Sequence, residues 1–190
     1  MPRPEEQTIY GVNAVQAAFA HRPEALRRAF FTRERRREVA EILRHCAAKR
    51  LPYREVEDAE LQTITRSEHH EGLALVTRPL AAVGLEAFLP ARPDALLLVL
   101  DDVGNPHNLG AILRSAASFG AAGIVVGSTG AAARLSPAAI RVAQGGAEVV
   151  PLAHVERLPA ALEQLRRGGY RVIAAEAEHG VGLFVAPLSW

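Results

Sequence analysis

The spacing of apolar residues in the second half of the chain predicts alternating short strands and helices. Residues 95–100 form a fully apolar run, which is typical of a parallel strand buried on both faces. A helix is expected over 108–119, ended by Gly120, because its apolar side chains form one stripe at helical spacing. Further strands are expected at 123–126, 149–152 and 170–175, and further helices at 137–143 and 158–167. This order predicts an open parallel sheet with right-handed crossovers.

The first half of the chain shows a similar alternation of helix and strand. A helix capped by Asn13 is expected to run to residue 20. A charged helix is expected over 33–50, because its apolar positions follow helical spacing, and a shorter helix over 61–65. Strands are expected at 26–32, 53–56 and 73–77. These elements predict a small α/β layer domain.

Composition divides the chain into two expected domains, 1–78 and 95–190. The intervening residues 79–94 contain three prolines and are interpreted as a linker. Residues 1–78 carry 14 basic and 12 acidic side chains, and the rest of the chain carries 8 basic and 9 acidic side chains. The whole chain has 190 residues and a net charge of +1, so overall charge predicts no strongly bound partner. The first domain is nevertheless modestly basic.

Several classes of protein are excluded or disfavoured by the sequence. Cys46 is the single cysteine, so no intramolecular disulfide forms and a reducing compartment is expected. The N-terminus lacks the apolar core of a secretory signal, and no apolar run approaches the ~20 residues that span a bilayer. His69 and His70 have no second pair at metal-ligand spacing and are expected to mark a turn. We therefore expect a cytoplasmic protein with neither a membrane segment nor a metal site.

The segment 101–116 is the most informative for chemistry. It follows the first strand of the parallel sheet and opens the next helix, an edge at which ligands bind in open α/β folds. Gly110 and Arg114 lie one turn apart, so Gly110 is expected to leave space while Arg114 faces a cleft. Asn108 is expected either to cap the helix or to point its amide at a ligand. The alternative is a capped helix with a surface arginine, and no glycine-rich phosphate loop is present.

This segment also carries a resemblance to a known family. Residues 105–116, Asn-Pro-His-Asn-Leu-Gly-Ala-Ile-Leu-Arg-Ser-Ala, resemble the first signature motif of the SpoU (TrmH) family of S-adenosylmethionine-dependent RNA ribose 2′-O-methyltransferases. Residues 141–151 are similar to the family segment before the third strand. Residues 9–19 and 69–76 resemble the two ends of an L30e-like substrate-binding domain found in many members. The resemblance covers essentially the whole chain.

The resemblance implies a fold, a reaction and site residues. The fold would be a small L30e-like α/β domain followed by an open parallel-sheet α/β-knot (SPOUT) methyltransferase domain. The reaction would be methyl transfer to a ribose 2′-hydroxyl of rRNA or tRNA. Arg114 and Asn108 match the motif residues that organise the reacting ribose. Ala175 and Glu176, at the end of the fourth strand, would touch the cofactor S-adenosylmethionine, and the protein would be a homodimer.

Structured RNA is the partner that the resemblance implies, and the basic residues of the chain suggest where it binds. The candidate phosphate contacts are Arg27, Arg28, Arg35, Arg36 and Arg141. Interleaved glutamates keep a second interpretation open, in which the arginines of the first domain form a solvated helix face with ion pairs.

The sequence departs from the family pattern after the fourth expected strand. Two further family motifs, which build most of the cofactor pocket and pass through the knot, are absent before the apolar ending at Trp190. This chain is therefore expected neither to tie the knot nor to bind S-adenosylmethionine well. The alternative function is a truncated or degenerate member that binds RNA without methylating it. A generic nucleotide-binding protein is disfavoured because no glycine-rich phosphate loop occurs.

Overall fold

The N-terminal region of the protein contains a four-stranded mixed sheet. The computed structural model describes residues 5–90, 92, 95–127, 135–175, 181–182 and 185. The first sheet has the order β1-β4-β2-β3, in which β4 runs antiparallel to β1 and β2, and β2 runs parallel to β3. The strands are β1 (Gln7–Tyr10), β2 (Leu26–Phe31), β3 (Tyr53–Glu55) and β4 (Leu73–Thr77), and the helices are α1 (Val12–His21), α2 (Ala40–Lys49) and α3 (Asp58–Thr65). The small α/β layer domain is confirmed.

The N-terminus of α1 differs from the expectation. Asn13 does not cap this helix, which begins at Val12 after Gly11, an N-cap with φ of 89°. The backbone N–H of Val12 donates to Oε2 of Glu71 at 2.9 Å, so a side chain remote in sequence satisfies the first turn.

The prediction of a single charged helix over 33–50 is also wrong. Arg33–Arg35 form a 3-10 turn, and α2 begins only at Ala40. Residues 35–37 are all arginine, and positive charge opposes the positive end of the helix dipole. The helix therefore begins beyond the arginines, with Glu41 in its first turn.

The C-terminal region contains a three-stranded parallel sheet of order β5-β6-β7, which confirms the expected sheet class. Residue Val125 on the central strand pairs with Val99 on one side and Ala153 on the other. The strands are β5 (Leu97–Leu100), β6 (Gly123–Gly127) and β7 (Leu152–Val155), and the helices are α4 (Pro106–Ser118), α5 (Pro137–Ala143), α6 (Gly146–Val149) and α7 (Leu158–Arg167).

Three expectations for the parallel sheet require correction. The strand expected at 149–152 begins instead at Leu152, because Val149 ends the short helix α6. The strand expected at 170–175 is not formed, and Val172 and Ile173 are 42% and 51% exposed. The apolar strand β5 is half-buried throughout, since β6 is its only pairing partner within the described part of the chain.

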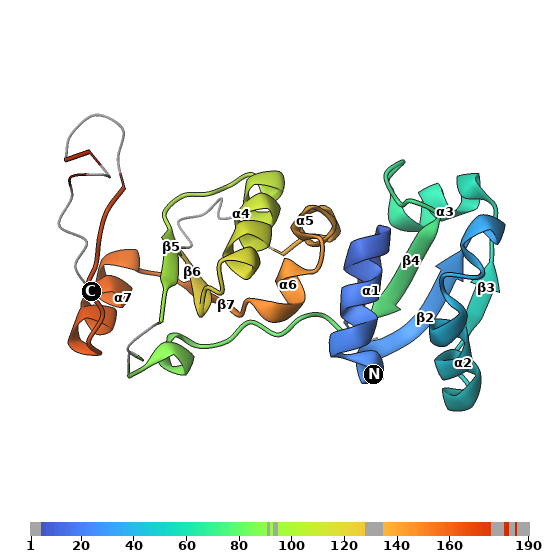
Figure 1. Cartoon of the computed structure of the whole chain (residues 1–190), viewed down its shortest axis with the longest axis horizontal. Coiled ribbons are helices and arrows are strands. Elements are labelled where there is room, and N and C mark those ends of the chain that lie inside the picture. The colour runs from blue at the N-terminus through green and yellow to red at the C-terminus, as the bar shows by residue number, and fades with distance from the viewer. Residues whose placement is uncertain are drawn as a thin grey trace.

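The hydrophobic core joins the two regions. One cluster of buried side chains includes Ile9 and Val15 from the first region and Leu109, Leu113 and Ile140 from the second. Figure 1 shows α5 and α6 between α4 and α1, and each of these two helices contacts both neighbours. The segment expected as a linker contains a 3-10 turn, Leu85–Phe88, and pairs with β7 through a bridge from Val83 to Ala153.

Two negative findings apply to the described residues. None of their helices has both the length and the apolar character needed to cross a bilayer. No cluster of three or more histidine, cysteine or acidic side chains in these ranges is arranged to hold a metal ion. His70 occupies the turn before β4, as the sequence predicts, and its side chain is buried there. The Nδ1 atom of His70 accepts a hydrogen bond from Gly72 N–H at 3.1 Å.

Candidate functional site

The helix α4 begins at the carboxyl end of β5, where the sequence places the candidate chemistry. Asn105 is its N-cap, and the Asn105 side chain accepts a hydrogen bond from His107 N–H at 2.8 Å. Pro106 occupies the first turn, where its missing N–H costs nothing. The cap is thus Asn105 and not Asn108, which is exposed and whose side chain has no hydrogen-bond partner among the described residues. The amide of Asn108 is therefore available to a ligand.

Arg114 lies on the outer face of α4. Leu109, Leu113 and Ala116 form the buried stripe of the helix, and Arg114 is exposed. Its guanidinium has neither an ion pair nor a hydrogen bond with any part of the chain that the structure describes, although its carbonyl accepts from Ser118 Oγ at 3.0 Å. An exposed guanidinium without a partner among the described residues is suited to binding an anion.

Gly110 does not leave the space that the sequence suggested. A Cβ at this position would lie 2.5 Å from the carbonyl oxygen of Ala139 and 2.8 Å from Cβ of Val142. Both residues belong to α5, so the glycine permits close packing of α4 against α5. The expectation that Gly110 opens a ligand cleft is wrong.

Asn108 and Arg114 do not contact each other. Six residues of α-helix separate them by about 9 Å along the axis and about 120° around it. His107 instead shares the exposed face of Arg114, since a spacing of seven residues is almost two full turns. The apolar pattern does not single out His107, but its i, i+7 spacing from Arg114 is a signal in the sequence that identifies it.

The arginines expected to contact RNA are mostly engaged with carboxylates. Arg28 pairs with Glu6, Arg35 with Glu38 at 2.8 Å, and Arg36 with Glu55 at 2.9 Å. These pairs are at least partly exposed, and such ion pairs are weak enough to exchange for a phosphate. Arg27 is half-buried and has no ion pair to a described residue.

Arg141 lies on α5 and faces the N-terminal region. Its Nε donates to the carbonyl oxygen of His69 at 2.7 Å, and its Nη2 donates to Oε1 of Glu71 at 3.0 Å. Its RNA contact stays a prediction, and the side chain joins the two regions in this structure.

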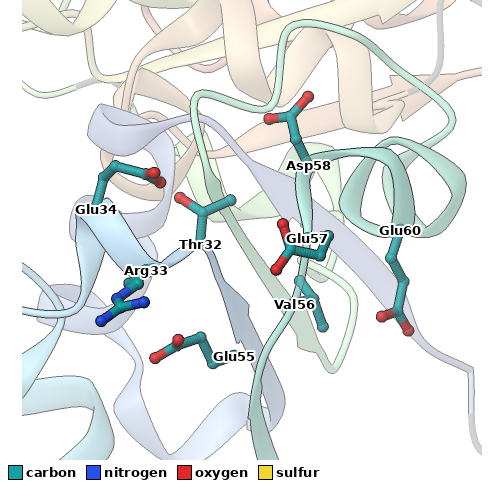
Figure 2. Close-up of a pocket in the computed structure, with 8 residues that line it drawn as sticks. All are labelled: Thr32, Arg33, Glu34, Glu55, Val56, Glu57, Asp58 and Glu60. Atoms are coloured by element: carbon teal, nitrogen blue, oxygen red, sulfur yellow. The ribbon is translucent and has the colours of Figure 1, made fainter.

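A hollow of about 450 Å³ lies at the carboxyl ends of β2 and β3 (Figure 2). Arg33 is the one basic residue among the described lining residues, which are Thr32, Arg33, Glu34, Glu55, Val56, Glu57, Asp58 and Glu60. A hydrogen bond from its own backbone N–H, and then one from the Thr32 hydroxyl, lower the pKa of the Glu34 carboxyl. The hollow is therefore acidic at neutral pH and repels phosphate.

The two positions expected to touch the cofactor are only partly described. Ala175 is exposed and lies outside any strand. Glu176 lies outside the described residues. The carboxyl end of β5 is followed by Asp101 and Asp102, which are both exposed.

Comparison with known proteins places the chain in one family. The model of the SpoU rRNA Methylase family matches residues 95–186, and that of the RNA 2′-O ribose methyltransferase substrate binding domain matches residues 8–83. A 23S rRNA (guanosine-2′-O-)-methyltransferase RlmB from Pseudomonas putida is 36% identical over 182 residues, with 92% of this chain and 73% of the relative covered. The chain belongs to the SpoU family.

Other SpoU relatives are longer than this chain. An uncharacterized tRNA/rRNA methyltransferase YfiF from Escherichia coli O157:H7 is 38% identical over 187 residues, which covers 98% of this chain and 54% of the relative. An uncharacterized tRNA/rRNA methyltransferase from Haemophilus influenzae is 37% identical over 173 residues, which covers 90% of this chain and 48% of the relative. The chain spans about half the length of these curated relatives.

Solved SpoU structures share the fold. An rRNA methyltransferase from Sinorhizobium meliloti superposes with a TM-score of 0.72 at 20% identity, covering 94% of this chain and 65% of that one. The SpoU methyltransferase AviRb from Streptomyces viridochromogenes, in complex with the cofactor AdoMet, superposes with a TM-score of 0.66 at 24% identity. The match covers 85% of this chain and 58% of that one. The expected SpoU α/β fold class is confirmed.

Proposed function

We propose that the protein methylates the 2′-hydroxyl of a ribose in rRNA or tRNA. The observation that carries the proposal is Arg114, which is exposed and without a charge partner in the described chain, on the helix that follows β5. Arg114 matches the arginine of the family motif, and the resemblance implies that it acts on the reacting ribose. The names of the relatives, which include a guanosine-2′-O-methyltransferase of 23S rRNA, support the same reaction.

The chemistry of Arg114 limits its role. A guanidinium stays protonated in proteins, so Arg114 is not the base that removes the 2′-hydroxyl proton. It stabilises the negative charge that develops on the attacking oxygen and holds a neighbouring phosphate. Asn108 orients the ribose through its free amide. The proton passes to another acceptor, and His107 on the same helix face has the right chemistry.

The methyl donor would be S-adenosylmethionine, the cofactor bound in the AviRb structure. We expect weak binding of this cofactor by the 190-residue chain, because Ala175 is exposed and lies outside any strand. Calorimetric titration with S-adenosylmethionine measures it, and tight binding would contradict this expectation. Ala175 and Glu176 remain the proposed contacts.

RNA would be held at the end of the N-terminal sheet that lies away from the acidic hollow. Arg27 lies near the start of β2, and Lys49 and Arg50 lie at the end of α2, a few residues before β3. Since β2 and β3 are parallel, these cations lie together at the end opposite the hollow. Arg28, Arg35 and Arg36 would add contacts beyond this end by exchanging their carboxylate partners for phosphate, since Arg35 and Arg36 follow the residues of the hollow. Arg141 would add a contact while it stays paired with Glu71.

An RNA titration tests this surface. Replacing Arg27 by alanine is expected to weaken binding to RNA of every sequence. The slope of the logarithm of the association constant against the logarithm of salt concentration should decrease in magnitude by about one. Arg167→Ala, at an exposed pair with Glu163 on α7, is the matched control and should leave the slope unchanged. Equal slopes for Arg27→Ala and the unaltered protein would remove Arg27 from the RNA contact.

Methyl transfer itself is tested with the complete product of the reading frame that encodes this chain. Labelled S-adenosylmethionine and rRNA or tRNA should give a product whose modified linkage resists alkali, because a 2′-O-methyl group blocks the attacking hydroxyl. Arg114→Lys keeps the charge but loses the planar fork, so kcat should fall by about 10²-fold or more. Unchanged transfer would remove Arg114 from the mechanism. RNA binding without any transfer would favour the alternative of a non-methylating RNA-binding member.

The proposal includes a cytoplasmic homodimer, as the family resemblance implies. Light scattering of the complete product decides this, since a monomeric mass would contradict the dimer.

A further inference from the structure

A buried ion pair ties α1 to α6. The Arg22 guanidinium, at the C-cap of α1, donates from Nε to Oε2 of Glu148 at 2.6 Å and from Nη2 to Oε1 at 3.1 Å. Its Nη1 also donates to the carbonyl oxygen of Arg78, beyond β4, at 2.6 Å. The side chains of Arg22 and Glu148 are only 14% and 1% exposed. A forked pair in this setting fixes one relative orientation of the two helices, because any other leaves a buried charge without its partner.

The helix α6 in turn lies directly against the backbone of Arg114. A Cβ on Gly146 would meet the carbonyl oxygen of Leu113 at 2.6 Å and Cα of Arg114 at 3.1 Å. No side chain separates α6 from α4 at this point. A shift or rotation of α6 therefore moves the backbone that carries Arg114.

A second path runs through α5. Arg141 on α5 binds Oε1 of Glu71, and the other oxygen of Glu71 caps α1 through Val12 N–H. Helix α5 also contacts α4 closely at Gly110. Figure 1 shows the resulting order, with α5 and α6 held between α1 and α4.

We propose that Arg22 and Glu148 are positioning residues, which set where Arg114 lies relative to RNA held by the N-terminal region. These contacts make one rigid unit of the N-terminal region, the layer of α5 and α6, and helix α4. A fixed distance between the RNA-binding end and Arg114 then determines which ribose reaches the guanidinium. This proposal rests on the proposed methyl transfer and adds to it a basis for choosing one nucleotide.

The first part of the test measures hydrogen exchange in the complete product. Arg22→Lys keeps a cation beside Glu148 but loses the fork, and Arg22→Met removes the cation. In both, amides of α4 around Leu113 and of α6 should exchange about tenfold faster or more. The β2 amides in the core of the N-terminal sheet report the loss of global stability, and the rise in exchange of the α4 and α6 amides should exceed theirs. Arg167→Lys, at the exposed pair with Glu163, is the matched control.

The second part measures catalysis in the same proteins. Arg22→Lys should lower kcat by about 10–100-fold, because a displacement near 1 Å at a reacting group has effects of this size. Affinity for RNA should stay within twofold, and methylation should spread to neighbouring nucleotides.

The outcomes separate the two proposals. Unchanged exchange in α4, or faster exchange with an unchanged kcat and a single modified nucleotide, overturns the positioning role and leaves the methyl transfer intact. Exchange that rises equally in β2 shows general destabilisation and also overturns it. If the unaltered protein transfers no methyl group, the proposed function is wrong, and the positioning role that rests on it is wrong as well.

Discussion

At the scale of single residues, the structure separates side chains that look alike in the sequence. Asn105 and Asn108 are three positions apart, and both are suited to cap a helix. Asn105 caps α4, whereas Asn108 lies within its first turns with its amide exposed. The first residue is therefore structural, and the second is available to substrate.

Stability measurements distinguish these two asparagines. Asn105→Ala is expected to lower the free energy of unfolding by about 1 kcal/mol, because the N–H of His107 loses its acceptor. Asn108→Ala should change it by less than ~0.5 kcal/mol, as is usual for an exposed side chain without partners. Urea denaturation of both variants checks this. A larger loss for Asn108→Ala would identify Asn108 as the structural residue.

At the scale of elements, two glycines determine how α4 packs. Gly110 allows α5 to approach α4, and Gly146 allows α6 to do so. Both helices meet the N-terminal region on their other sides, so α4 is positioned by backbone contacts. The glycines of the family motif thus serve helix packing in this protein.

Gly110→Ala tests this packing. Alanine favours a helix interior by about 1 kcal/mol over glycine, so a net loss of stability would report the clash with Ala139 and Val142. We expect a net loss of about 1–3 kcal/mol, the usual cost of overpacking. Ser115→Ala, on the exposed face, should be neutral or slightly stabilising. A stabilised Gly110→Ala variant would show that α5 yields without cost.

The elements also show what the sequence could and could not predict. Helix α7 and strand β4 lie within a residue of their expected bounds, because their own apolar patterns determine them. The start of α1 was missed because Glu71, 59 residues after Val12, supplies its cap. The break before α2 depends on the arginine run, in which apolar periodicity has no part. For the site, motif spacing found the exposed Arg114, but only tertiary packing reveals that Gly110 is buried.

At the scale of the whole molecule, the two regions share one core. The cluster that contains Ile9 also contains Leu109 and Ile124. Polar contacts reinforce the shared core, since Gln7 Nε2 donates to the carbonyl oxygen of Leu135 at 2.9 Å and Gln7 Oε1 accepts from Leu80 N–H at 3.2 Å. Composition suggested two domains and a linker, but it contains no information about the surface between them.

Calorimetry tests the shared core. The unaltered chain should unfold in a single transition, because neither region keeps its buried surface when the other unfolds. Arg22→Met leaves the buried Glu148 carboxylate unpaired, so the free energy of unfolding should fall by about 3–5 kcal/mol. Arg167→Met, at an exposed pair, should change it by less than ~0.5 kcal/mol. Two separate transitions in the unaltered chain would contradict this cooperativity.

The acidic hollow in Figure 2 has a consequence for the way a polyanion arrives. Its carboxylates lie at the carboxyl ends of β2 and β3, whereas Arg27 and Arg50 lie at the opposite ends of the same two strands. This separation gives the N-terminal region an electric dipole along its strands, and a nucleic acid diffusing towards it experiences a torque before contact. Encounters are therefore oriented, with the basic end leading, and added salt shortens the range over which this orientation acts.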